Sequence, residues 1–223
     1  IRDRSYLSPS NAILAEQAGN PFGVPILWLG RPLGSSFPSP NAPRESENIR
    51  LSLGLKGTII GFDWDFRYTY SKSEHYIYQP DTSTKKFSDA IAGKGGPGGD
   101  ESWNLFDPSA NSYSLVKWIS TAQETWTKNE LDVLDLVFSG DVGSTQQGSI
   151  DIAFGLQYRE EAFDVKRDKD SIVEFDSGGN LIKPADLLFL GGGSETSANR
   201  NAIALFTELS VPIINKFQVN GAI

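Results

Sequence analysis

Hydrophobic and polar residues alternate with a period of two along several parts of this chain. Between Ile49 and Ile59 the odd positions are aliphatic apart from one glycine, and the even positions are polar or glycine. From Phe62 to Tyr70 every even position is aromatic, and the odd positions carry three charges and a threonine. Successive side chains of a β-strand point to opposite faces. The pattern therefore predicts amphipathic strands that separate an apolar environment from a polar one.

The same alternation returns in the second half of the chain. Ile150–Tyr158 and Ile203–Val211 repeat it, and a last strand is predicted from Phe217 to Ile223. Leu131–Phe138 is also predicted to be a strand, with a bulge, because its two aspartates fall in different registers. Two short segments, Asn11–Ala18 and Ala122–Leu131, fit one or two turns of helix, which is too little to cover a sheet.

The connections between the predicted strands alternate in length. Short links join Ile59 to Phe62, Phe138 to Ser149 and Val211 to Phe217, whereas long segments follow Tyr70 and Tyr158. Short links at one edge of an up-and-down sheet and long loops at the other are typical of outer-membrane barrels. The clean strands, about 9–11 residues each, also have the length that crosses a bilayer when tilted. Tyr68, Tyr70 and Tyr158 stand toward the long-loop ends, where an interfacial aromatic girdle is expected.

Composition excludes several function classes. The chain has 223 residues, a net charge of −8 and 11% aromatic residues. It is too apolar for a disordered chain, and it lacks the clustered basic residues that nucleic-acid binding needs. With no Cys and one His, thiolate zinc sites, cysteine nucleophiles and most histidine metal sites are excluded. We expect no enzyme, no metal and no cofactor. Because the chain holds no Met and begins at Ile1, we expect a processed product or a piece of a longer protein.

Several short motifs follow one another in a defined order. They are Asn20–Gly23 (NPFG) with Gly30–Arg31 after it, Leu53–Gly57 followed by Phe62–Ser73 (FDWDFRYTYSKS), Phe138–Val142 (FSGDV) followed by Ala153–Phe163 (AFGLQYREEAF), and Arg200–Ile213 (RNAIALFTELSVPI) leading into Phe217–Ile223. In this order the chain resembles the barrel region of TonB-dependent outer-membrane receptors. The resemblance covers most of the chain as scattered short motifs.

The resemblance implies that residues 1–223 are a partial β-barrel domain from a larger protein. In that family a 22-stranded barrel encloses an N-terminal plug, and a short box contacts TonB; neither plug nor box is recognisable in this chain. The implied fold is all-β, an antiparallel up-and-down transmembrane β-barrel segment of about six or seven strands with long extracellular loops. The implied function is energised uptake of an iron chelate, cobalamin or oligosaccharide across the outer membrane of a Gram-negative bacterium. The implied partners are outer-membrane lipid, TonB through a plug domain absent from this chain, and the small-molecule or oligosaccharide ligand; no nucleic acid is expected.

On this hypothesis the apolar strand faces meet lipid and the opposite faces line the lumen or meet the plug. The residues predicted to face the lumen are Asp63, Asp65, Arg67, Asp151, Gln157 and Arg159. Asp63 and Asp65 also have the composition of a glycosidase pair or a metal site. We prefer a hydrated polar face on which Arg67 is the charge partner of the two carboxylates.

Aromatic residues in the first long connection are candidate ligand contacts, because exposed rings on loops stack against sugars or chelates. These residues are Trp103, Trp118 and Trp126; the alternative is that they pack the loop against itself. The run Gly93–Gly99 lacks the phosphate-loop spacing and is interpreted as a flexible loop. His75 and the acidic stretch of residues 160–170 are interpreted as solvated.

Two other function classes remain open. A secreted β-sandwich that binds carbohydrate would bury the same apolar faces against a second sheet. A β-rich hydrolase would use Asp63 and Asp65, although no matching general acid is identifiable. The first alternative differs from the barrel in one observable, which is whether the apolar faces are covered.

Overall fold

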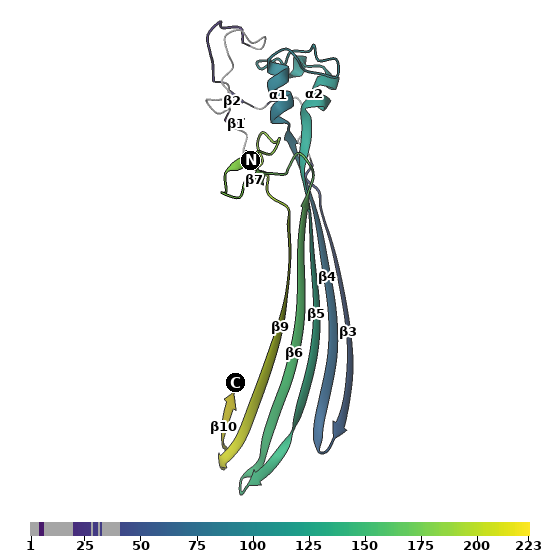
Figure 1. Ribbon diagram of the computed structural model, residues 1–223, viewed down its shortest axis with the longest axis vertical. Coiled ribbons are helices and arrows are strands. Elements are labelled where there is room, and N and C mark those ends of the chain that lie inside the picture. The colour runs from purple at the N-terminus through teal and green to yellow at the C-terminus, as the bar shows by residue number, and fades with distance from the viewer. Residues whose placement is uncertain (1–4, 7–19, 28, 31, 33–40) are drawn as a thin grey trace. The chain divides into compact units, whose positions relative to one another are not determined.

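The computed structural model describes residues 5–6, 20–27, 29–30, 32 and 41–223. Its largest element is a six-stranded sheet in the order β10-β9-β6-β5-β4-β3 (Figure 1). These strands are β3 (Arg44–Ile59), β4 (Phe62–Thr82), β5 (Ser120–Thr145), β6 (Gly148–Arg167), β9 (Thr196–Ile214) and β10 (Phe217–Ala222). Strands that follow one another within this sheet are neighbours, and the prediction of an antiparallel all-β chain is confirmed.

The strands are longer than the alternation of residues predicted. β4 has 21 residues and β5 has 26, because pairing continues where both faces become polar. Beyond Tyr70, for example, the Ser73 hydroxyl donates to the Asn48 side chain at 2.6 Å. The helical prediction at Ala122–Leu131 was wrong, since this segment lies within β5. The other helical prediction, Asn11–Ala18, lies outside the described residues.

A tight two-residue turn joins β3 to β4. Ile60 and Gly61 both have positive φ, 49° and 82°, which is the requirement of a type I′ turn. Such a turn matches the twist of the strands that it joins. Two cross-strand hydrogen bonds fit this turn: Thr58 donates to Asp63, and Ser52 bonds to Thr69. In each pair the two residues are equally far from the turn, as in a regular hairpin.

The chain divides into two compact units, each described by itself. Unit 1 comprises Ile1–Glu45, Tyr76–Trp126 and Lys166–Glu195, and unit 2 comprises Ser46–His75, Thr127–Val165 and Thr196–Ile223. Strands β3, β4, β5 and β6 contribute residues to both units. The assignment of residues 1–223 to one partial barrel domain stays a prediction.

Unit 1 contains two helices in a connection that the sequence predicted only as a loop. The helices are α1 (Thr84–Ile91) and α2 (Tyr113–Ile119). Ser83 caps α1 by accepting from the Lys86 N–H at 3.1 Å. The other short elements are the 3₁₀ turn η2 (Pro108–Ala110), the pair β1 (Ser5–Tyr6) and β2 (Leu29–Gly30), and the pair β7 (Glu174–Phe175) and β8 (Leu181–Lys183). No helix in the described part of the chain is long and apolar enough to cross a membrane.

A small hydrophobic core holds the helices of unit 1 together. Phe87 of α1 meets Trp103 edge-on, with ring centroids 5.9 Å apart, and Leu115 of α2 belongs to the same cluster. Part of the glycine-rich run Gly93–Gly99 packs against this core, since Gly95 and Gly96 are buried, whereas residues 97–99 are exposed. The Gly95 N–H donates to the Glu101 carbonyl at 2.7 Å, and a Cβ on Gly95 would lie 2.8 Å from Leu115.

Candidate functional site

Unit 2 has one apolar face and one polar face, and register decides which residues share each. Directly opposed residues of antiparallel strands point to the same side. The pairing of β6 with β9 places Leu156 opposite Leu205 and Tyr158 opposite Ile203. We define the apolar face by Leu51, Leu53, Leu55 and Ile59 of β3; Phe62, Trp64, Phe66, Tyr68 and Tyr70 of β4; Leu134, Leu136 and Phe138 of β5; Ile152, Phe154, Leu156 and Tyr158 of β6; and Ile203, Leu205 and Leu209 of β9.

Ring contacts join the apolar residues of neighbouring strands into one surface. Phe138 stacks on Phe154 with centroids 5.3 Å apart, and Phe62 meets Phe154 edge-on at 5.9 Å. On the other side of β4, a Cβ on Gly57 would lie 2.8 Å from the Trp64 ring. Trp64 therefore covers a position that carries no side chain of its own, and the apolar face is continuous from β3 to β6.

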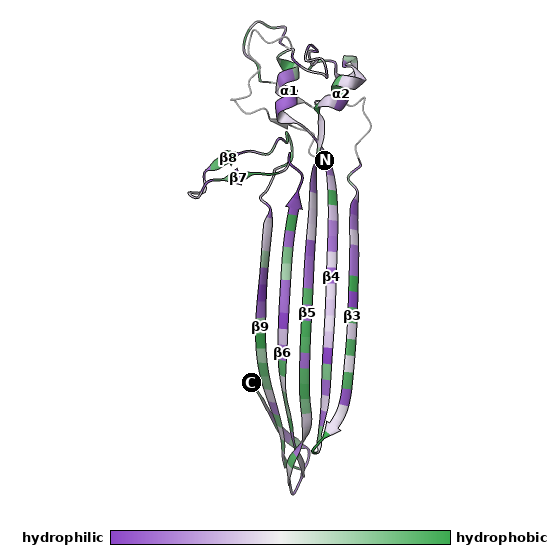
Figure 2. Ribbon diagram, turned by 45° about the vertical axis from the view of Figure 1, so that its right-hand side comes forward, coloured by the Kyte–Doolittle hydropathy of each residue, from purple (hydrophilic) through white to green (hydrophobic). Residues whose placement is uncertain are grey.

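The apolar face is exposed. Leu53 is 60% exposed and Leu205 is 76% exposed, and most other aliphatic residues of the face are also well above the buried range. Figure 2 shows the hydrophobic residues gathered on the parts of β5 and β9 nearest the turns. Soluble monomers rarely expose a contiguous apolar surface of this extent. Exposed apolar surfaces of this kind mark sites that contact another protein, a ligand or a membrane.

Tyrosines bound to carboxylates mark one edge of the apolar face. The Tyr68 hydroxyl donates to Asp132 at 2.5 Å, and the Tyr70 hydroxyl donates to Glu130 at 3.2 Å. The same oxygen of Glu130 accepts from the Lys128 ammonium at 2.9 Å. The rings thus continue the apolar surface while their hydroxyls enter a charged zone. Tyrosine favours such positions, where one end of the side chain is apolar and the other is wet.

The polar face carries all six residues that were predicted to face a lumen. On β4, Asp65 pairs with Lys56 at 3.1 Å and with Arg67 at 3.2 Å, and Asp63 accepts from Thr58 at 2.8 Å. The other three, Asp151, Gln157 and Arg159, alternate with the apolar residues of β6. Each of these carboxylates has its partners on the sheet. This favours the interpretation as a hydrated polar face over the interpretation as a catalytic pair. Whether this face lines a lumen stays a prediction.

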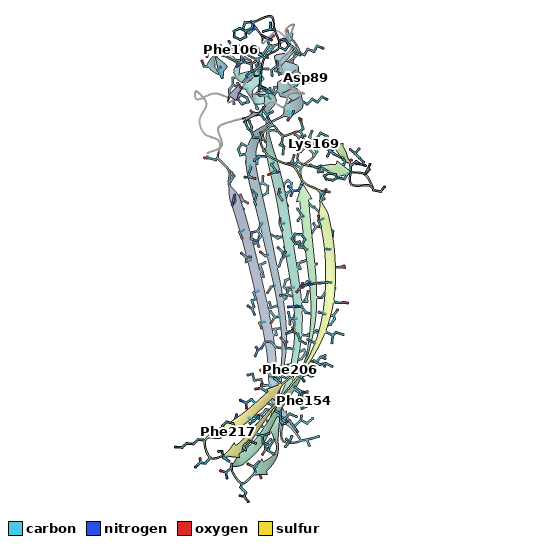
Figure 3. All side chains as sticks on the ribbon, turned by 90° about the vertical axis from the view of Figure 1, so that its left-hand side faces the viewer. Asp89, Phe106, Phe154, Lys169, Phe206 and Phe217 are labelled. Carbon is cyan, nitrogen blue, oxygen red and sulfur yellow. The ribbon has the colours of Figure 1, made fainter. Side chains whose placement is uncertain are left out.

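Alternation along the strand predicts one aromatic residue on the polar face, but sequence reasoning did not find what its ring covers. Phe206 of β9 is paired with Gly155 of β6, and its ring occupies the space that a Cβ on Gly155 would need. Figure 3 labels Phe206 on β9 and Phe154 on the neighbouring β6; register places the two rings on opposite faces of the sheet, because Phe154 is paired with Thr207. A glycine in the middle of an alternating strand was the available signal, because an aromatic ring on the next strand often covers such a position.

Two aspartates of β5 explain a segment whose alternation is irregular. Asp132 joins Tyr68 at the edge of the apolar face, and Asp135 accepts from Gln157 at 2.7 Å on the polar face. Each aspartate therefore has a cross-strand partner on its own side of the sheet. Alternation within β5 alone could not reveal this, because it depends on the residues opposite.

No family model, curated protein or solved structure matches this chain. The case for a function therefore rests on the two faces and on the side chains at their edges.

The single histidine belongs to a hydrogen-bonded chain that does not activate a nucleophile. Ser73 lies 2.9 Å from His75 Nε2 and donates its only proton to Asn48 Oδ1. The histidine must therefore donate to the serine oxygen, the reverse of the polarity that serine hydrolysis needs. Among the described residues, no group of acidic or histidine side chains has the arrangement of a metal site.

The three predicted ligand-contacting tryptophans have different environments in unit 1. Trp103 is 1% exposed and belongs to the core, which leaves no ring face for a ligand. Trp118 packs on the same core, with the Lys86 ammonium 5.8 Å from the centre of its ring. Trp126 is 43% exposed and lies on β5, not in a loop. Of the three, Trp126 is the most exposed, since Trp118 is only partly exposed.

Proposed function

We propose that this chain forms part of the wall of an outer-membrane β-barrel of the TonB-dependent receptor type. In this proposal the apolar face meets lipid, and the polar face lines the interior or meets a plug that another part of the protein supplies. The function is energised uptake of a ligand such as an iron chelate, cobalamin or an oligosaccharide. One observation carries the proposal, namely a wide sheet whose apolar side is exposed and whose other side is charged.

The height of the apolar face supports a bilayer setting. On β4 it extends from Phe62 to Tyr70, and on β6 its outer residue is Tyr158. Strand segments of about 9–11 residues cross the hydrocarbon core when tilted. Three tyrosines, including Tyr68, stand at the same edge of this face, as the aromatic girdle of a membrane barrel does.

The apolar face also runs obliquely to the strands. Tyr70 ends it on β4 and bonds to Glu130 of β5, but the first apolar-face residue of β5 is Leu134, four positions further along. From β6 to β9 the edge stays level, with Tyr158 opposite Ile203. The edge of the apolar face is therefore displaced by four residues, about 13 Å along the strands, between β4 and β5. Strands of membrane barrels are tilted by about 35–45°.

The same observation favours a barrel wall over a carbohydrate-binding β-sandwich. A sandwich needs its apolar residues packed against a second sheet about 10 Å away. Leu53 and Leu205 are instead more than half exposed. A hydrolase built on Asp63 and Asp65 has less support, because Asp65 is already paired with two cations.

Site-directed spin labelling in lipid bilayers tests the proposal. The chain has no cysteine, so a single introduced cysteine can be labelled without background. Labels at Leu53, Trp64 and Phe154 are expected to be accessible to oxygen, which partitions into lipid. Labels at Asp65 and Asp151 are expected to be accessible only to a water-soluble nickel chelate.

Trp64 and Asp65 are adjacent on one strand and differ only in face, so each is the matched control for the other. The proposal fails if the Trp64 label is shielded from both quenchers, since that would place the apolar face inside a protein core. It fails equally if the Asp65 label is the one reached through lipid.

A further inference from the structure

An aromatic pair with a carboxylate beside it stands on the strands of unit 1. The rings of Tyr76 on β4 and Trp126 on β5 are stacked, with centroids 5.3 Å apart and an angle of 28° between their planes. The Tyr76 hydroxyl donates to Glu124 Oε2 at 2.6 Å. Because Trp126 is 43% exposed, part of the ring surface remains open to solvent.

Hydrogen bonds hold the backbone beneath this pair in place. The Glu124 N–H donates to the Asp168 carboxylate at 2.9 Å, and the Asp168 N–H donates back to the Glu124 carbonyl at 3.3 Å. The next residue, Thr125, accepts from the Arg167 guanidinium at 3.2 Å. Because these bonds fix the strand, the Trp126 ring is already positioned before a ligand binds, and little conformational entropy is lost on binding.

We propose that Trp126, Tyr76 and Glu124 form a binding site for a saccharide. The C–H faces of a sugar ring pack against an aromatic ring of this kind, and sugar hydroxyls donate to a neighbouring carboxylate. An ionised carboxylate has about four acceptor positions, and the Tyr76 hydroxyl occupies one of those on Glu124. The site therefore offers both parts of sugar recognition, an apolar platform and a hydrogen-bond acceptor at its edge.

The charge around the site favours a neutral sugar over an anionic ligand. Glu124 itself is acidic, Asp168 is bonded to its backbone, and the whole chain carries a net charge of −8. A phosphate or carboxylate ligand would meet like charge here. Neutral sugar units occur either in free oligosaccharides or in lipid-anchored glycans, and the chemistry of recognition is the same for both.

The saccharide site does not depend on the barrel proposal, because it is built from unit 1 residues and can be tested in detergent micelles. The full chain is titrated calorimetrically with maltohexaose and cellohexaose as free neutral oligosaccharides. A parallel titration uses lactosylceramide, which carries a neutral sugar on a lipid anchor, with ceramide as its lipid control. Binding in the first arm identifies free oligosaccharide as the source, and binding to lactosylceramide but not to ceramide identifies the anchored glycan.

The variants Trp126→Ala and Trp126→Phe connect binding to the ring. Removal of the ring is expected to weaken binding about fivefold to tenfold, and phenylalanine is expected to restore part of it. Phe106→Ala is the matched control, since Phe106 is an exposed aromatic residue of the same unit (Figure 3). Its loss is expected to leave binding unchanged.

A direct readout guards against a variant that fails to fold. The indole N–H resonance of Trp126 is identified as the one missing from the spectrum of Trp126→Phe, and it is expected to shift when sugar is added to the unaltered chain. The proposal is overturned if no sugar binds at about 10 mM, where even a millimolar site would be mostly filled. Equal binding to ceramide, an unmoved Trp126 resonance, or an equal loss in Phe106→Ala would overturn it as well.

Discussion

The two units of this chain differ in the burial of their apolar side chains. In unit 1, Leu115 and Phe87 are almost completely buried and pack in one cluster with Trp103. In unit 2, Leu53 and Leu205 stand on a broad sheet face and are mostly exposed. The buried apolar residues of unit 1 and the exposed ones of unit 2 are of the same types. The difference lies in what each set contacts.

This contrast separates two ways in which apolar residues stabilise a structure. In unit 1, burial within the protein itself removes apolar area from water. In unit 2, hydrogen bonds along the strands hold the sheet, and the apolar face stays available to a medium outside the chain. A membrane-spanning sheet needs that arrangement, since its backbone must be satisfied internally while its side chains meet lipid.

The largest expected effect is a comparison of the same truncation in the two units. Leu115→Ala is expected to lower the free energy of unfolding by about 2–5 kcal/mol, because it leaves a cavity in a closed core. Leu205→Ala is expected to cost only about 0.5 kcal/mol, because little of its side chain is covered by protein. Urea unfolding of the full chain in detergent, followed by circular dichroism, measures both. Equal losses at the two sites would mean that the face bearing Leu205 is buried.

A second test places a charge on each face of β9. Leu205→Arg is expected to cost about 2–4 kcal/mol in a phospholipid bilayer, because an arginine near the middle of the apolar face would have to leave water. Ala204→Arg, one residue away on the polar face, is expected to cost less than about 1 kcal/mol. Reversible unfolding from lipid vesicles measures the difference. If Ala204→Arg is the more damaging substitution, the faces have been assigned the wrong way round.

The strands of unit 2 could be predicted because the alternation of apolar and polar residues lies within each strand. Alternation from Phe62 to Tyr70 or from Ile150 to Tyr158 needs no knowledge of the neighbouring strand. The helices of unit 1 could not be predicted in the same way. α1 and α2 have only eight and seven residues, too few for a helical period to stand out, although Ser83 and Ser112 are ordinary N-cap residues.

Contacts between strands were beyond the reach of the sequence for a different reason. The bonds from Tyr70 to Glu130 and from Tyr76 to Glu124 depend on how β4 and β5 are aligned. A long connection joins these two strands, so no turn geometry fixes their register as it does in a tight hairpin. Trp126 was selected from the sequence as a loop residue, but its stacking partner follows only from that alignment.

The smallest expected effect concerns a buried carboxylate at the end of β4. Asp81 accepts backbone N–H groups from Thr82 at 2.6 Å and from Leu190 at 2.7 Å, and burial raises its pKa above the ordinary value of about 3.9. Relative to the unfolded chain, folding therefore favours the protonated form of Asp81. Its contribution to stability is fully present below the ordinary pKa and is lost as pH rises through the raised one. Relative to the unaltered chain, Asp81→Asn is expected to become more stable as pH rises from 4 to 7.

Asp176 provides a control of opposite sign in the same unit. Asn180 donates to it from both its side chain and its backbone, and these bonds lower the pKa of Asp176. The contribution of Asp176 to stability is present above its ordinary pKa and is lost as pH falls through the lowered one. The difference in stability between Asp176→Asn and the unaltered chain is therefore expected to become smaller as pH falls from 5 to 3. Urea midpoints measured across both intervals compare the two variants. If they shift in the same direction, general charge repulsion in an acidic chain, and not burial at Asp81, governs the pH dependence of unit 1.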